Sequence, residues 1–281
     1  MLMIELANLE FHAAHACNLF CAQCSHYSNF HAGGLVSLDE ANANFSAWKD
    51  RLAPKRIVIL GGEPTLNPEL LTIIELARES FPNAEGLFVT NGFFLDRHPD
   101  LPRVLIDNRF RMDVSEHGRA PEYMKRFRLV RQQLRQWRAA YPELQINIRK
   151  SHRGWRQQYR MVDGKPMPFC SDPKAAWKIC LQRTCTQLNQ SCLWKCPALA
   201  YHAIMSRKLR LDDEPAWQLF RDYQACPPTA SDEQVRTFFA TEEIKQCSLC
   251  PARKIHFRHA NPISIVSSGK TSDTQGSSIT Q

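Results

Sequence analysis

The sequence lacks any apolar run that approaches the ~20 residues needed to span a bilayer, so we expect no transmembrane helix and no membrane partner. Its first residues, MLMIELANLEF, lack a basic segment and a small-residue cleavage site, and they include two glutamates, so they do not resemble a secretory signal. No internal repeat is visible, which argues against a repeat architecture. From these absences we expect a cytoplasmic protein.

Acidic residues are outnumbered, because the chain has 36 Lys and Arg against 28 Asp and Glu, a formal net charge of +8. That charge suits an anionic partner such as a phosphate ester or a nucleic acid, but it identifies none. Hydrophobic residues make up 43% of the chain and charged residues 23%, as in ordinary soluble globular proteins. With 281 residues, the chain is long enough for a large α/β domain with a modest addition.

Cysteine is abundant and unevenly distributed. The chain has 11 cysteines, and an odd number without an export signal argues against a disulfide framework and for thiolate ligation of metal. Three of them lie within residues 17–24, and the others fall between residues 170 and 250. The grouping therefore predicts two separate metal sites.

Residues 5–150 alternate between strand-like and helix-like segments. Short β-rich runs occupy residues 8–14, 56–62, 86–92, 110–118 and 144–150. Helix-like stretches occupy residues 37–51, 67 onward, 97–107 and 121–142. A repeated strand–helix rhythm with apolar strands predicts a parallel sheet, either open or curved into a barrel.

Two helix starts have local capping signals. Ser37 begins Ser-Leu-Asp-Glu, in which Ser37 and Glu40 have the spacing of a capping box. Asn67 is expected to cap the next helix, with Pro68 at its first position.

Beyond residue 150 the rhythm stops. We assign residues 1–150 to a core domain and residues 151–260, which are dense in Cys, Trp and Pro, to a second module where metal replaces part of the core. Residues 261–281 are rich in Ser, Thr, Gly and Gln and are expected to form a disordered tail without a catalytic role.

Cys17, Cys21 and Cys24 lie on a short stretch directly after the first predicted strand. Three thiolates there can bind three irons of a cubane cluster and leave the fourth iron without a protein ligand. The alternative is a zinc site completed by His15 or His26. The spacing C-x3-C-x2-C resembles that of the radical S-adenosylmethionine (SAM) superfamily. The resemblance extends over about residues 5–150 of this chain.

The resemblance implies a fold, two cofactors and a first reaction step. It implies a partial (β/α)6 TIM-like barrel, a 4Fe–4S cluster held by the three thiolates, and SAM bound at the open iron. Reduction would then cleave SAM to a 5′-deoxyadenosyl radical. The usual aromatic residue before the third cysteine is replaced by Gln23, and Phe20 is a substitute candidate for the adenine contact.

A glycine-rich segment ends the second predicted strand. Gly61, Gly62, Glu63 and Pro64 form GGEP, where the glycines let the backbone approach a ligand and the Glu63 carboxylate can face an ammonium group. Taken alone, this is a weak motif with a simple turn as its alternative. Together with the cysteines upstream it resembles the superfamily's SAM-amine motif. Asn91 and Ser115 end the next two strands and are implied contacts for the ribose or methionine of SAM.

The later cysteines resemble an auxiliary-cluster module of the twitch or SPASM type. In that resemblance the ligands are Cys180 and Cys196, which bracket a hairpin, and the CxxC pair Cys247 and Cys250. The usual hairpin glycine is Ser191 here. Four ligands favour one auxiliary 4Fe–4S cluster, although four thiolates also suit zinc. The roles of the remaining cysteines stay open: Cys170, Cys185, Cys192 and Cys226.

The sequence predicts an oxidoreductase-like enzyme acting on a polar small molecule, such as a sugar or amino sugar, with flavodoxin or ferredoxin as electron donor. One alternative is the oxidation, crosslinking or epimerisation of a ribosomal peptide. Another, from a different class, is a zinc-stabilised nucleic-acid-binding protein that uses the basic helix around residues 125–138.

Overall fold

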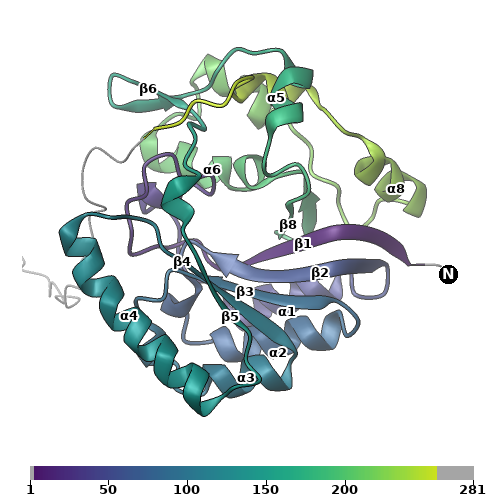
Figure 1. The fold of residues 1–281 in the computed structure, drawn as a ribbon. Coiled ribbons are helices and arrows are strands. Elements are labelled where there is room, and N and C mark those ends of the chain that lie inside the picture. The colour runs from purple at the N-terminus through teal and green to yellow at the C-terminus, as the bar shows by residue number, and fades with distance from the viewer. Residues whose placement is uncertain (1–2, 258–281) are drawn as a thin grey trace, which may run out of the picture.

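The computed structural model describes residues 3–257 and is built around a seven-stranded sheet with the order β5-β4-β3-β2-β1-β8-β9 (Figure 1). Neighbouring strands pair in parallel except β8 and β9, which are antiparallel. The strands are β1 (Ile4–Ala14), β2 (Leu52–Gly61), β3 (Glu85–Thr90), β4 (Phe110–Ser115), β5 (Ile146–Arg149), β8 (Thr186–Asn189) and β9 (Cys192–Trp194).

Four helices cover one face of this sheet, below the strands in Figure 1. Strand side chains such as Phe11, Ile57 and Phe88 are fully or almost fully buried there, in the largest apolar cluster of the molecule. Burial of this continuous apolar surface is the main source of stability for such a layer. The helices are α1 (Leu38–Ser46), α2 (Leu70–Ser80), α3 (Leu101–Asp107) and α4 (Pro121–Ala140).

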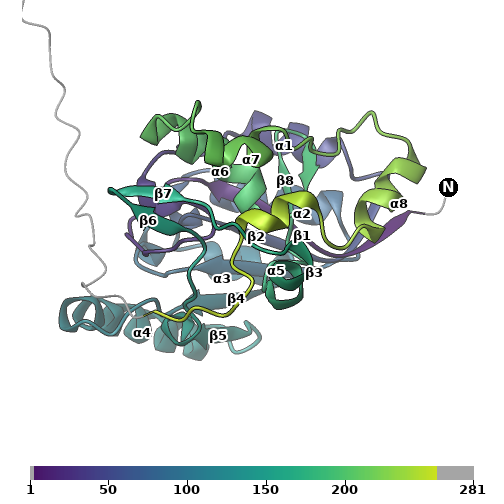
Figure 2. The same ribbon diagram turned by 90° about the horizontal axis from the view of Figure 1, so that it is seen from above.

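The opposite face of the sheet has only a small apolar cluster, made of Val58, Leu60 and Leu87 with Val89 packed against it. The C-terminal segments lie over this face, as Figures 1 and 2 show. They are β6 (Arg160–Val162), β7 (Lys165–Met167), α5 (Pro173–Ile179), α6 (Pro197–Leu209), α7 (Gln218–Arg221) and α8 (Asp232–Ala240).

Short 3-10 turns connect several of these elements and complete the assigned secondary structure. They are η1 (Ser28–Phe30), η2 (Pro64–Leu66), η3 (Leu95–Arg97), η4 (Ser151–Arg153), η5 (Pro215–Trp217) and η6 (Lys245–Leu249).

The α/β fold is the predicted one, with a mostly parallel sheet. The sixth parallel strand, however, is β8, which comes from the cysteine-rich region and pairs with β1. Among the described strands, β5 and β9 form the two edges of the seven-stranded sheet, so the sheet is open rather than a closed barrel. The sheet therefore contains strands from both sides of the predicted boundary near residue 150, and the division into two domains stays a prediction.

The two predicted capping residues both accept a hydrogen bond from a backbone amide. The Ser37 hydroxyl accepts a hydrogen bond from the Glu40 amide at 3.2 Å, as a helix cap does. The Asn67 side-chain oxygen accepts from the Glu69 amide at 2.9 Å, which is the predicted capping hydrogen bond, although α2 itself begins at Leu70. The amide nitrogen of the same side chain donates to the carbonyl groups of Ala13 and Val36, so Asn67 also links β1 to the chain before α1.

The hairpin of β8 and β9 turns without a glycine. Gln190 and Ser191 have φ angles of 53° and 57°, in the region that normally favours glycine. Side chains of the first part of the chain hold this turn, because Asn44 accepts a hydrogen bond from the Ser191 amide and Trp48 donates to the Ser191 carbonyl, both at 2.8 Å. Tertiary hydrogen bonds thus offset the cost of the backbone conformation.

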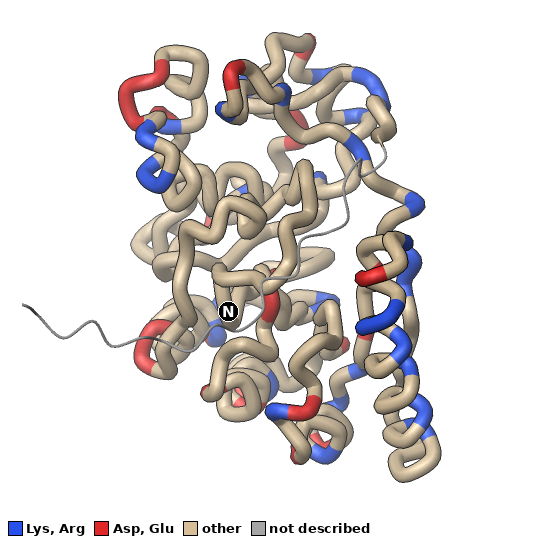
Figure 3. Tube along the Cα trace, turned by 90° about the vertical axis from the view of Figure 1, so that its left-hand side faces the viewer, with Lys and Arg blue, Asp and Glu red and all other residues tan. Residues whose placement is uncertain are grey.

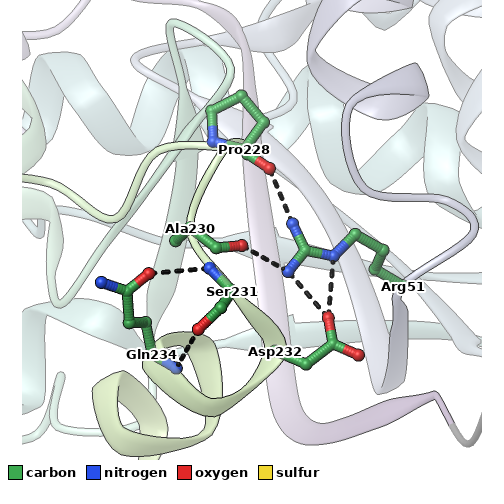
Figure 4. Close-up of polar contacts among 6 residues, drawn as sticks. All are labelled: Arg51, Pro228, Ala230, Ser231, Asp232 and Gln234. Atoms are coloured by element: carbon green, nitrogen blue, oxygen red, sulfur yellow. Dashed lines mark hydrogen bonds and ion pairs between the residues drawn. The ribbon is translucent and has the colours of Figure 1, made fainter.

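Arg51 makes a second link between distant segments (Figure 4). Its guanidinium donates to the carbonyl groups of Pro228 and Ala230, each at 2.7 Å, and pairs with Asp232 at 2.8 Å. Asp232 begins α8, whose cap Ser231 forms a full capping box with Gln234. One side chain therefore fixes the start of α8 against the start of β2.

Within residues 3–257, every helix is too short or too polar to cross a membrane. The predicted tail, residues 261–281, lies outside the described residues.

Candidate active site

The three cysteines of residues 17–24 lie on the loop between β1 and η1 and line a common cavity of about 410 Å³. Cys21 is buried, and Cys17 and Cys24 are partly buried. The cavity opens over the carboxyl ends of the parallel strands, where the sheet turns towards the C-terminal segments. This is the usual position of ligand sites in parallel α/β sheets.

Burial raises the pKa of all three thiols. For Cys17 and Cys21, neighbouring acidic groups raise the pKa further, including Glu63 near Cys17 and Cys24 near both. Backbone amides of the loop act in the opposite direction and lower the pKa of Cys17 and Cys24. A bound cation would also lower the pKa, because thiolate ligands deprotonate when they bind metal.

Polar atoms without partners surround the same loop. Within the described part of the chain, Asn18 Nδ2, His26 Nε2 and Ser28 Oγ are buried and have no hydrogen-bond partner. His26 and Ser28 line the cavity with the cysteines. Because buried polar atoms are normally satisfied, their arrangement fits a site that binds a polar ligand.

Gly61 and Gly62 are required because the backbone at the end of β2 lies very close to the backbone that follows β1. A Cβ atom on Gly61 would lie 2.2 Å from the Ala14 carbonyl oxygen, and one on Gly62 would lie 2.3 Å from the Ala16 oxygen. The Gly62 amide donates to the Ala14 carbonyl, and the Glu63 amide donates to the Ala16 carbonyl, both at 2.8 Å. The glycines thus bring the end of β2 against the start of the cysteine loop, and both line the cavity.

The Glu63 carboxylate is fully buried and accepts several hydrogen bonds from the protein. Its oxygens accept from the hydroxyl and amide of Thr65, from the Thr90 hydroxyl, and from the Asn91 amide at 2.7 Å. Burial raises its pKa, while these hydrogen bonds lower it. Glu63 therefore ties the ends of β2 and β3 together, and contact with a ligand ammonium group stays a prediction.

Asn91 and Ser115, at the ends of β3 and β4, both line the cavity, as predicted for neighbouring strand ends. The Asn91 side-chain amide donates to Asn18 Oδ1 at 2.7 Å. This bond holds Asn18, which follows the first cysteine of the loop, against the end of β3. Sequence reasoning did not select Thr90, whose hydroxyl binds Glu63 and which also lines the cavity.

Phe20 and Gln23, both in the cysteine loop, have different surroundings. Phe20 is 41% exposed and its ring lies 3.7 Å from that of His31, so its contact with a bound adenine stays a prediction. Gln23 is buried, and its side-chain oxygen accepts from the amides of Gln158 at 2.7 Å and Tyr159 at 3.0 Å. The residue that replaces the usual aromatic side chain thus connects the cysteine loop to the C-terminal region.

The wall of the cavity away from the cysteines contains residues that sequence analysis did not assign to this site. They lie on the inner face of the sheet and on the C-terminal segments, and their side chains are mixed in charge and polarity. The pattern that marks them is their position on alternate strand residues, opposite the helix-covered face. They include Glu10 on β1, Arg56 on β2, Arg149 on β5, and Trp155 and Cys185 beyond the core.

The four later cysteines share a second cavity. Its volume is about 130 Å³, and the cysteines are Cys180, Cys196, Cys247 and Cys250. Burial raises the pKa of each of them, to about 12 for Cys196, and each is raised further by at least one other acidic group nearby. Among the described residues, no group of three or more His, Cys, Asp or Glu side chains is placed to hold a single metal ion.

Residues 13–147 match the family model of the radical SAM superfamily. The crystal structure of BtrN in complex with AdoMet and 2-DOIA has a similar fold, with a TM-score of 0.50 and 17% identity over 89% of this chain and 93% of that chain. Native anSMEcpe with bound AdoMet and Cp18Cys peptide gives a TM-score of 0.39 and 19% identity. That match covers 52% of this chain and 42% of anSMEcpe, less than half of its length. No curated protein matches the chain.

Proposed function

Because this chain belongs to the radical SAM superfamily through residues 13–147, we propose that it cleaves SAM reductively and uses the resulting radical to oxidise a polar small molecule. Members of the superfamily use a 4Fe–4S cluster together with SAM. The single observation that carries the proposal is the cavity shared by Cys17, Cys21 and Cys24 with the ends of the parallel strands.

Cys17, Cys21 and Cys24 are the proposed ligands of the SAM-binding cluster. The donor set fits, because three thiolates bind three irons and leave the fourth for SAM. When bound, the cluster supplies the electron that splits the SAM sulfonium into methionine and a 5′-deoxyadenosyl radical. Burial raises the pKa of these thiols, and a bound metal would offset this effect by balancing the charge of the thiolates.

SAM itself is proposed to lie along the strand ends. Gly61 and Gly62 present backbone to the cavity, and Asn91 and Ser115 add side-chain polar groups. Glu63 acts by holding Thr90 and Asn91 in place, and Pro64 begins the turn η2 that keeps this carboxylate oriented. Phe20 remains the candidate for the adenine contact. The orphaned amide of Asn18 lies next to Asn91 and offers a further donor.

An auxiliary 4Fe–4S cluster is proposed at Cys180, Cys196, Cys247 and Cys250, in a twitch-like module formed by residues 151–260. The support is the shared cavity, together with the predicted hairpin of β8 and β9 between the first two of these cysteines. Such a cluster beside the larger cavity would accept an electron from a substrate radical, which makes a net oxidation possible. Zinc at the same four thiolates is the alternative that metal analysis distinguishes.

The proposed substrate is a polar small molecule of the sugar or amino-sugar class. The cavity, at about 410 Å³, lies in the size range of small-molecule sites. Residues of the C-terminal segments line it opposite the sheet. Flavodoxin or ferredoxin is the proposed electron donor. Lys and Arg positions gather along α4 (Figure 3), and most of these residues are exposed, which gives this helix a positive surface that suits an acidic donor.

Reconstitution without oxygen, followed by SAM and dithionite, tests the first step. We expect 5′-deoxyadenosine in the wild type and a loss of at least about 100-fold in Cys21→Ala, because its iron site cannot assemble. The matched control is Cys170→Ala, which removes an exposed cysteine that lines neither cavity. Wild-type protein that binds a cluster but never yields 5′-deoxyadenosine would contradict the proposal.

Iron, sulfide and zinc analysis tests the auxiliary site in the same preparations. We expect Cys247→Ala to lower the iron content by about four atoms per chain, while Cys170→Ala leaves it unchanged. One zinc atom per chain that is lost in Cys247→Ala, with the iron content unchanged, would show that these cysteines hold structural zinc and no auxiliary cluster.

A further inference from the structure

One acidic side chain faces the larger cavity and forms no salt bridge with another described residue. Glu10, on β1, lines the cavity together with the thiols of the cysteine loop. One of its carboxylate oxygens accepts a hydrogen bond from Gln187 Nε2 at 2.6 Å. Within residues 3–257, no Lys, Arg or His side chain lies within ion-pair distance of Glu10.

The carboxylate is held by buried groups. Gln187 is fully buried, and its amide nitrogen also donates to the Cys185 carbonyl at 2.9 Å. Its amide oxygen accepts from the Tyr201 hydroxyl at 3.0 Å, and Tyr201 is itself almost fully buried. Because the oxygen of Gln187 is engaged by Tyr201, its NH2 group must face Glu10. The Cys185 side chain adds a hydrogen bond to the same carboxylate. These buried groups therefore orient Glu10 before any ligand arrives.

The positive groups on the same wall already have carboxylate partners. Arg56 pairs with Glu85 at 2.9 Å, and Arg149 lies 3.7 Å from Asp113. Glu10 has no such close partner, although the charge of Arg149 acts on it from a longer distance. Burial raises the pKa of Glu10, while hydrogen bonds to Gln187 and Cys185 and the charge of Arg149 lower it. A cation bound in the cavity would remove the cost of keeping this carboxylate ionised in partial burial.

We propose that Glu10 binds an ammonium group of the substrate, so that the substrate class is a polar small molecule bearing a primary amine. This inference rests on the proposed function, in which the cavity holds the substrate next to SAM. It narrows the proposed sugar and amino-sugar class to its amine-bearing members. Gln187 and Tyr201 are positioning residues in this site, because they act through Glu10.

The test compares amines with their hydroxyl counterparts on the reconstituted protein in the presence of SAM. The probes are glucosamine against glucose and an inosamine against inositol, with dissociation constants measured by anaerobic equilibrium dialysis. The variant is Glu10→Gln, which keeps the size of the side chain and an acceptor for Gln187. Its matched control is Glu5→Gln, an exposed carboxylate on the same strand.

We expect the wild type and Glu5→Gln to bind at least one amine roughly tenfold or more tightly than its counterpart, and Glu10→Gln to lose that preference. Wild-type protein that binds neither amine better than its hydroxyl counterpart overturns the inference, as does a preference that persists in Glu10→Gln. The formation of 5′-deoxyadenosine, measured in the same samples, separates the two proposals. Its presence without an amine preference overturns this inference alone, and its absence overturns the proposed function.

Discussion

The first part of the chain, residues 3–150, and the second, residues 151–257, are stabilised in different ways. In the first part, the helix-covered face of the sheet buries one large apolar cluster with side chains such as Leu9, Phe45 and Phe88. The second part has a smaller cluster around Tyr159 and Trp217, and it contains most of the cysteines. Apolar burial therefore accounts for the first part, whereas the second needs further ties.

Several of those ties are hydrogen bonds from side chains of the first part to backbone groups of the second. Gln23 binds the amides of residues 158 and 159, Trp48 binds the Ser191 carbonyl, and Arg51 binds the carbonyls before α8. The comparison shows that side chains of the first part hold the backbone of the second part in place. Its own apolar core is too small to define where the strands β8 and β9 and the cysteines lie.

The largest effect is expected from a deletion in the apolar cluster of the first part. Phe88→Ala should lower the free energy of unfolding by about 3 to 5 kcal/mol, because it removes a fully buried ring and leaves a cavity. Urea unfolding followed by circular dichroism measures this change. The control is Leu129→Ala on α4, which is 67% exposed and should change stability by less than about 0.5 kcal/mol. Equal losses in the two variants would contradict the role given to this cluster.

Acid sensitivity should arise in part from the second region. Burial lowers the pKa of His202 to about 4 from an ordinary value of 6.5. The unfolded chain therefore binds a proton more readily, so this residue's contribution to stability is present above pH 6.5 and is lost as the pH falls towards 4. Between about pH 7 and about pH 5 the loss is on the order of 2 kcal/mol.

The measurement for His202 is the free energy of unfolding at the two pH values, in the wild type and in His202→Gln. We expect the difference between the two pH values to shrink in the variant, whatever its absolute stability. An unchanged pH dependence would show that this buried histidine is not the source of the acid sensitivity.

A smaller effect is expected at the link shown in Figure 4. Arg51→Ala should cost about 1 to 2 kcal/mol, because two carbonyl groups and Asp232 lose a partner that is mostly buried. Arg56→Ala is the matched control, since the Arg56–Glu85 pair is more exposed and such pairs contribute at most about 1 kcal/mol. Hydrogen exchange should locate the Arg51→Ala change in α8. Protection lost uniformly across the sheet would argue against a local link.

The strands and helices of the first part could be predicted from the sequence because their patterns are local. The predicted strand at 56–62 is part of β2, the predicted helix at 121–142 is α4, and the Ser37 cap is present. Asn67 makes the predicted capping hydrogen bond to the Glu69 amide, but its second role, in which its nitrogen bridges the carbonyls of Ala13 and Val36, had no signal in the sequence. That second role depends on neighbours far away in the sequence.

Two features of the site depended on the tertiary structure in the same way. The sequence selected the glycines of GGEP for the approach of a ligand. In the structure, glycine is required there because a Cβ atom would collide with the carbonyl groups of Ala14 and Ala16. Glu10 was not selected at all, because a single carboxylate in a strand carries no motif. It becomes significant only when β8 brings Gln187 beside it and the cavity forms around it.

The sequence by itself determined the resemblance to the radical SAM superfamily, the alternating elements of the first part and the groups of cysteines, because each depends on short spacings or local periodicity. Only the tertiary structure decided that β8 joins the sheet beside β1, that Gln23 connects the cysteine loop to the second part, and that Glu10 faces the cavity. These are contacts between residues more than 100 positions apart in the chain. Packing of the whole molecule selects such contacts, and no local pattern encodes them.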